Sequence, residues 1–118
     1  MPKIDIKVFL HHEEFDTVNQ FTGLYKDGVL KYLEDKNIKV SLDYNNKTLL
    51  RDTNDFRMFF DFDKNILKVN YKDLDVETEI RIKTININVN KKNIEIKYEI
   101  EESQEIFIYR IEELKWVY

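Results

Sequence analysis

The segment VSLDYNNKTLLRDTNDFRMFFDFDKNILKVNY, residues 40–71, decides the fold because it alternates apolar and polar side chains between breaks rich in Asn and Asp. A period of two residues is typical of strands with one buried face, and Asn and Asp tolerate turn conformations. Loops at Asn45–Asn46, Thr53–Asn54 and Lys64–Asn65 bring one set of side chains to a single face, whereas a one-residue slip would place Lys or Asn there. The predicted apolar face consists of Val40, Leu42, Leu49, Phe56, Met58, Phe60, Phe62, Leu67, Val69 and Tyr71.

This register treats the two arginines of the segment differently. Arg51 lies on the apolar face, where a guanidinium is costly unless it is paired and hydrogen-bonded. Arg57 lies on the other face, beside Asp61, where water can hydrate its charge. The expected cross-strand pairs are Leu42–Leu49, Val40–Arg51, Arg51–Phe56, Leu49–Met58, Met58–Tyr71, Phe60–Val69 and Phe62–Leu67.

Alternation continues on both sides of this segment. Gly28, in YKDGVL, is expected to take a positive φ in a hairpin turn. Such a meander must form a sandwich or close into a barrel, and closure removes exposed edges. We therefore predict an all-β fold, a single antiparallel meander closed into a small β-barrel of about 8–10 strands with little or no helix, and one domain over residues 1–118. Strands are expected near 3–10, from 15 through a bend at Gly23, and near 29–34, 38–44, 48–52, 55–62, 66–72, 76–89, 93–101 and 106–117.

Composition narrows the classes of function. Lysines and acids alternate along the strands and the net charge is −4, so the basic stripe of a nucleic-acid binder is missing. There is no cysteine, which excludes disulfides and thiolate metal sites. No apolar run approaches the roughly 20 residues of a membrane span, and charges interrupt the N-terminal MPKIDIKVFLHHEE where a signal peptide needs an apolar run. We expect a cytoplasmic protein with neither nucleic acid nor membrane as partner.

Single residues scattered along the chain match the pattern of a known family. The chain resembles, from about Lys3 to about Trp116, the YwiB-like family of small bacterial calycin-like β-barrels, a domain of unknown function. Where the family has a glycine shortly after its arginine, this chain reads RDTND. The resemblance implies a barrel akin to lipocalins and fatty-acid-binding proteins and supplies no reaction. The matching residues are Gly23 and Tyr25 in FTGLY, Tyr32 and Glu34 in YLE, Arg51 in TLLR, Met58 and Phe60 in FRMFF, Tyr71 in VNYKDL, Thr84 in IRIKT and Tyr98 in IEIKYEI.

Arg51 is the sharpest candidate for a functional side chain. If DKN, residues 35–37, is a three-residue loop, Tyr32 lies opposite Val40 and Glu34 points inward near Arg51, whereas a two-residue loop leaves a lysine inside. Three roles for Arg51 stay open: a structural network with Tyr32 and Glu34, an anchor for a ligand's carboxylate or phosphate, or a rim position in water. The candidate ligand-binding residues inside the barrel are Arg51, Tyr32, Glu34, Met58 and Tyr71.

Other chemistry is sparse. HHEEFD, residues 11–16, contains metal-ligand residue types, but neighbours in a strand point to opposite faces, so His11 and His12 are not expected to share an ion. We expect no metal and no cofactor. Ser41 and Ser103 lie far from the histidines in sequence, and two glycines cannot make a glycine-rich phosphate loop. Support for an enzyme is thin, and no catalytic residue is assigned.

Two functions fit these features. The first is a non-catalytic binding protein for a small, anionic or amphipathic ligand in the barrel mouth. The second is a protein–protein interaction module that uses an edge strand or an exposed aromatic surface at Phe59 or Trp116, with the interior filled by side chains. The many large residues of the inner face favour a filled or narrow interior. A cavity above about 300 Å³ lined by Arg51, Met58 and Tyr71 would favour the first. A monomer and a homodimer are both compatible with the sequence.

Overall fold

Ten antiparallel strands close into one barrel, which confirms the predicted all-β fold class. The computed structural model describes residues 3–13, 15–89 and 93–117, and side chains at 89 and 114–117 are outside the description, among them that of Trp116. Within the described residues no helix is long and apolar enough to cross a membrane. The strands are β1 (Lys3–His12), β2 (Phe15–Lys26), β3 (Val29–Asp35), β4 (Ile38–Asp43), β5 (Thr48–Asp52), β6 (Phe56–Asp61), β7 (Ile66–Tyr71), β8 (Val76–Val89), β9 (Asn93–Ile100) and β10 (Glu105–Val117).

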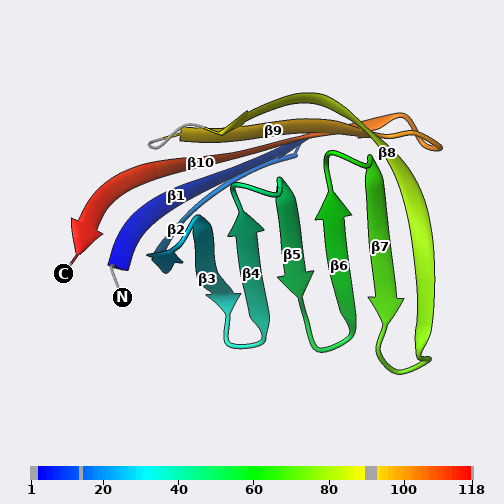
Figure 1. The fold of residues 1–118 in the computed structure, drawn as a ribbon, viewed down its shortest axis with the longest axis horizontal. Coiled ribbons are helices and arrows are strands. Elements are labelled where there is room, and N and C mark those ends of the chain that lie inside the picture. Colours follow the sequence, from blue (N-terminus) through cyan, green and yellow to red (C-terminus); the bar gives the residue numbers. More distant parts are fainter. Residues whose placement is uncertain (1–2, 14, 90–92, 118) are drawn as a thin grey trace.

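The strands follow a meander. Each strand lies beside its neighbour in sequence, and the pairing of β1 with β10 closes the ring. Figure 1 shows β3–β7 standing side by side, with β1, β9 and β10 running at a steep angle to them. Lys3 pairs with Val117, so the two ends of the described chain lie together.

The core follows the predicted period of two. Along β1, the buried side chains Ile4, Ile6 and Val8 alternate with more exposed ones. Apart from tyrosines, the buried side chains of the described residues are aliphatic or phenylalanine. Burial of such apolar surface is the main favourable contribution to folding, so this alternation is what holds the sheet closed. The buried members of the predicted apolar face are Val40, Leu42, Leu49, Phe60, Phe62, Leu67 and Val69.

The predicted register is right for β4–β5 and wrong for the next two pairs. Val40 lies opposite Arg51, as expected. Arg51, however, lies opposite Met58 rather than Phe56, and it is Phe56 that lies opposite Tyr71. Each turn is centred one residue away from the expected place, so pairing shifts by two residues and every side chain keeps its face. Thr53 sets the first turn: its amide donates to the Phe56 carbonyl at 2.9 Å.

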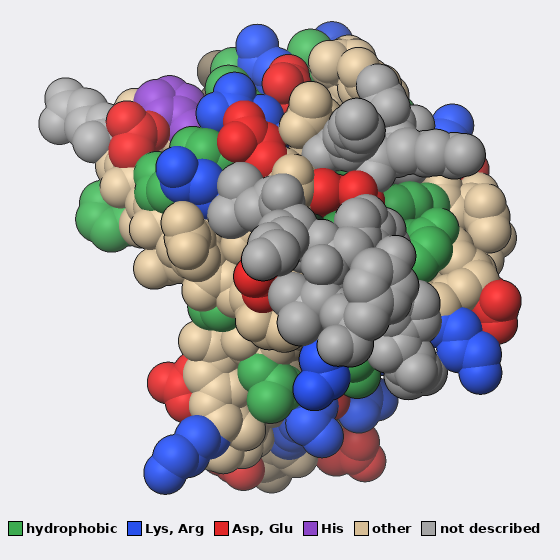
Figure 2. All heavy atoms as spheres, turned by 90° about the vertical axis from the view of Figure 1, so that its left-hand side faces the viewer, with side chains coloured by type: hydrophobic (Ala, Val, Ile, Leu, Met, Phe, Trp, Pro, Cys, Tyr) green, Lys and Arg blue, Asp and Glu red, His purple; other side chains and the backbone are tan. Residues whose placement is uncertain are grey.

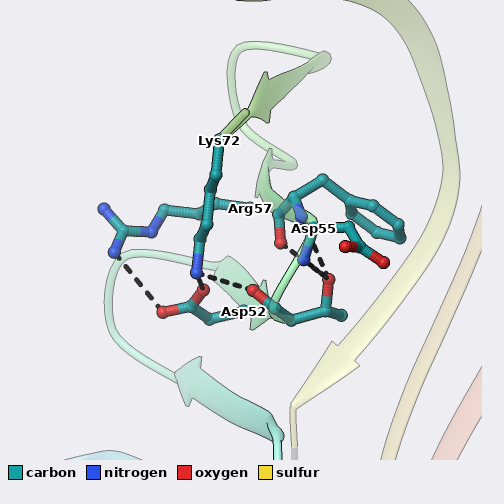
Figure 3. Close-up of polar contacts among 6 residues, drawn as sticks. Asp52, Asp55, Arg57 and Lys72 are labelled. Atoms are coloured by element: carbon teal, nitrogen blue, oxygen red, sulfur yellow. Dashed lines mark hydrogen bonds and ion pairs between the residues drawn. The ribbon is translucent and has the colours of Figure 1, made fainter. Parts of the chain in front are cut away.

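Polar contacts outside the barrel tie this turn to the end of β7 (Figure 3). The Lys72 ammonium donates to Asp52 Oδ1 at 2.5 Å and to the Thr53 carbonyl at 2.6 Å. Arg57 Nη2 lies 3.4 Å from Asp52 Oδ2. Arg57 therefore faces outward as predicted, but its acidic partner is Asp52 and not Asp61.

Strand β2 is paired unequally on its two sides. It pairs with β1 through residues 15–24, but with β3 only through residues 24–26. A Cβ on Gly23 would lie 3.1 Å from the Lys31 carbonyl oxygen and 3.0 Å from a Leu30 methyl group. Because glycine has no side chain, β2 can approach β3 closely at the point where the pairing of the two strands begins. The pairing of β2 with β1 shows no bulge at Gly23. Gly28 has φ +81°, which confirms the predicted hairpin turn.

Candidate binding cavity

The β3–β4 hairpin brings Glu34 to the inner face through a bulge. Tyr32 lies opposite Val40, as the three-residue loop predicted, but Asp35 lies opposite Ile38, so the turn itself has two residues. The register shift between Leu33 and Asp35 leaves Glu34 as the extra residue of the strand. Bulges commonly re-aim a side chain in this way.

Glu34 and Arg51 form an ion pair inside the barrel. Arg51 Nε and Nη2 donate to the same oxygen, Glu34 Oε2, at 3.2 Å and 3.0 Å. The Arg51 side chain is 36% exposed and that of Glu34 24%, so both keep some contact with solvent. Among the contacts of the described residues, Arg51 Nη1 and Glu34 Oε1 are left without a protein partner.

The pair borders a cavity of about 500 Å³ within the barrel. This volume lies within the range of roughly 300–1,000 Å³ that is typical of small-molecule sites. Most of the wall is apolar, and Asp35 adds a second carboxylate. One guanidinium and two carboxylates give the wall a formal charge of −1. The apolar part of the wall is formed by Val8, Leu10, Phe21, Ile38, Leu49, Met58, Phe60 and Phe107.

Three tyrosines surround the ion pair. Tyr32 and Tyr109 share a hydrogen bond between their hydroxyls, and both side chains are buried. Burial raises the pKa of each of these phenols, and it raises the pKa of Tyr98 against the opposing effect of Arg51. All three phenols are therefore neutral donors near pH 7. The Tyr98 hydroxyl makes no hydrogen bond with another described residue and Tyr98 lines the cavity, so it can serve a ligand.

The structure brings together four of the five predicted site residues. Arg51, Glu34 and Met58 line the cavity, and Tyr32 lies behind it, in hydrogen-bond contact with Tyr109. Tyr71 lies on the predicted face of β7 but is 45% exposed and does not line the cavity, so the expectation that it belongs to the site is wrong. The two-residue register shift places it in the last pair of β6–β7, beyond the core.

Sequence reasoning missed the contribution of β10. Phe107 and Tyr109 line the cavity. Their signal was available, because IFIYRI, residues 106–111, alternates in the same phase as the buried Ile111. What alternation could not reveal is that β10 and β3 face each other across the barrel closely enough for Tyr109 to reach Tyr32.

Features of the outer surface compete with the cavity. A larger hollow of about 880 Å³ lies outside β7, β8 and β9, but its wall is mainly charged, with Lys64, Glu79 and Arg81 among its residues. A ligand gains little from apolar burial there. The side chain of Phe59, named as an exposed aromatic candidate, is half-buried. The interior cavity is therefore the better candidate for a small-molecule site.

Comparison with known proteins supplies no relative from which a site could be transferred. No protein-family model matches the chain, and no curated protein or solved structure matches it either. The candidate site accordingly rests on the contacts described above.

Proposed function

We propose that the protein is a non-catalytic binding protein that holds one small amphipathic ligand in its barrel. The observation that supports this most is the cavity of about 500 Å³, whose apolar wall meets a cluster of polar groups around Arg51. A barrel of about eight strands is just wide enough to hold one small ligand, and this one has ten strands. Apolar walls with a few placed polar groups are characteristic of such sites.

The charges of the wall narrow the class of ligand. Among the described residues, no group occupies Arg51 Nη1 or the Tyr98 hydroxyl, which can donate, or Glu34 Oε1, which can accept. A simple anion would meet the carboxylates of Glu34 and Asp35 as well as Arg51. The wall therefore favours an apolar body with a neutral or zwitterionic polar head over a ligand that is only anionic.

Native mass spectrometry of freshly purified protein tests this proposal. The wild-type chain is expected to carry an additional mass of a few hundred daltons or to bind the neutral fluorescent amphiphile N-phenyl-1-naphthylamine. Arg51→Met is expected to weaken binding, whereas Arg57→Met is a matched control from the outer face of the same hairpin, paired there with Asp52. An empty chain that takes up no probe, or equal losses in both variants, would contradict the proposal.

We further propose that the chain belongs to the YwiB-like family and that the protein is cytoplasmic. A closed antiparallel barrel is compatible with the YwiB-like family. Five of the residues that carry the resemblance also line the cavity, which supports a shared site. They are Glu34, Arg51, Met58, Phe60 and Tyr98.

The free edge of β2 favours a second candidate function, self-association. Residues 15–22 pair with β1 alone, and Val18 on this stretch is 52% exposed. Such an edge is a template for another strand. If a second copy paired antiparallel with this edge so that the two Val18 residues faced each other, Asp16 of each copy would lie opposite Gln20 of the other. No like charges would then meet. Light scattering should detect a dimer that Val18→Lys weakens and Ile85→Lys, an exposed position on β8, does not.

A further inference from the structure

A second polar cluster lies where the β1–β2 hairpin meets the start of β10. His12 ends β1, Glu13 follows it in the turn, and Glu105 begins β10. One potential ligand atom from each of these three side chains lies within 4.8 Å of the other two. Figure 2 shows the histidines beside acidic side chains at the surface.

The fold aims His12 into this cluster and His11 away from it. Alternation along β1 places His12 on the same face as Val8 and Leu10. Its ring stacks on Phe107, with centroids 4.1 Å apart and planes 4° from parallel. Its Nε2 lies 2.7 Å from Glu105 Oε2. His11 instead contacts Asp16, so the two histidines do not share a site, as the sequence predicted.

The spacing of the three donors is close to that of a metal site. His12 Nε2 lies 2.7 Å from Glu105 and 3.9 Å from Glu13 Oε1. Zinc bonds of about 2.1 Å in tetrahedral geometry separate the ligand atoms by roughly 3.4 Å, a value between these two distances. The glutamate side chains are partly or largely exposed, so small rotations can close the difference. The two carboxylates also carry a formal charge of −2, which a divalent cation would neutralise.

We propose that His12, Glu13 and Glu105 bind one divalent transition-metal ion of the Zn²⁺ class. An imidazole with two carboxylates suits this class, whereas Ca²⁺ and Mg²⁺ take mainly oxygen ligands in larger number. Three protein ligands leave a fourth position for water or another group. Phe107, which stacks on His12, also lines the cavity, so the proposed site adjoins the cavity through this side chain. This proposal does not depend on the identity of the cavity ligand.

Calorimetric titration of the tag-free chain with Zn²⁺ tests the site. One ion per chain is expected, and Mg²⁺ should not compete. His12→Ala and Glu105→Gln should each weaken zinc binding at least about tenfold, the low end of what even outer-shell partners of a metal contribute. His11→Ala is the matched control, a neighbouring histidine on the opposite face, and should leave the affinity unchanged.

Nuclear magnetic resonance gives a readout that is independent of affinity. The chain has two histidines, so Zn²⁺ should shift the imidazole resonances of His12 and leave those of His11 in place. Glu105→Gln conserves the shape of the side chain and serves as the test if His12→Ala fails to fold. Absence of both heat and shift in the wild-type chain would overturn the proposal, as would an equal loss of affinity in His11→Ala.

Discussion

Arg51 on β5 donates two hydrogen bonds to one oxygen of Glu34 on β3, across the intervening strand β4. The pair therefore satisfies the inward guanidinium only in part. One nitrogen of Arg51 and one oxygen of Glu34 remain for other groups among the described residues. The structural and ligand-binding roles of Arg51 are thus compatible with each other.

Removing both partners of this pair is expected to cost less than the sum of the two single removals. Glu34→Gln leaves Arg51 without its counter-charge and should lower the free energy of unfolding by about 1 kcal/mol, a value kept small by the exposure of the pair. The double variant Glu34→Gln/Arg51→Met should cost less than the sum of the single variants. Urea denaturation measures all three, and strictly additive losses would show that the two side chains are not coupled.

The Tyr32–Tyr109 hydrogen bond is predicted to stabilise the barrel. Tyr109→Phe leaves a buried Tyr32 hydroxyl unpaired and should cost about 1–2 kcal/mol, whereas the double Tyr32→Phe/Tyr109→Phe variant should cost less than the two single changes together. Tyr98→Phe is the matched control, since its hydroxyl has no hydrogen bond to another described residue. Thermal unfolding tests the prediction, and an equal loss in Tyr98→Phe would argue against it.

Asp52 is predicted to stabilise the fold above acidic pH. The hydrogen bond from Lys72 is the main cause that lowers the pKa of the Asp52 carboxyl below its usual 3.8. A carboxyl with a lowered folded-state pKa contributes stability above the unfolded pKa and loses it as the pH falls through the folded value. Asp52→Asn should therefore flatten the loss of stability below about pH 4.

Asp55 gives the control for this pH dependence. It lies in the same turn (Figure 3), and its carboxylate contacts no cation among the described residues. Unfolding by urea at a series of pH values between neutral and acidic conditions measures the effect. The same flattening in Asp55→Asn would show that net charge, and not the Lys72 contact, is responsible.

Gly23→Ala is predicted to separate β2 from β3. The added methyl would lie 3.1 Å from the Lys31 carbonyl oxygen. This neighbour is a backbone atom, so moving it away would disturb the strand and cost free energy. We expect a loss of about 1–3 kcal/mol, with hydrogen exchange accelerated at residues 24–26, where the two strands pair. Gln20→Ala, an exposed change on the same strand, should stay within about 0.5 kcal/mol. Unchanged exchange in Gly23→Ala would show that the strand pair tolerates the methyl.

Local pattern was enough to predict most of the fold. Alternation places strands and faces, because a one-residue slip would bury Lys or Asn in place of Val40 or Leu49. It could not place the turn centres, because a shift of two residues preserves every face. Tyr71 shows the consequence. It lies on the predicted face, but its pair with Phe56 is the last one of β6–β7, so its side chain lies outside the core.

By itself, the sequence determined the strands, the meander and the inward position of Arg51, because each depends on neighbours within one hairpin. Tertiary structure alone decided which distant side chains meet. The approach of Tyr109 to Tyr32 and that of Glu105 to His12 both depend on how strands far apart in the chain are placed when the barrel closes. Closure is a property of the whole sheet, and its geometry brings together residues whose separation along the chain carries no local signal.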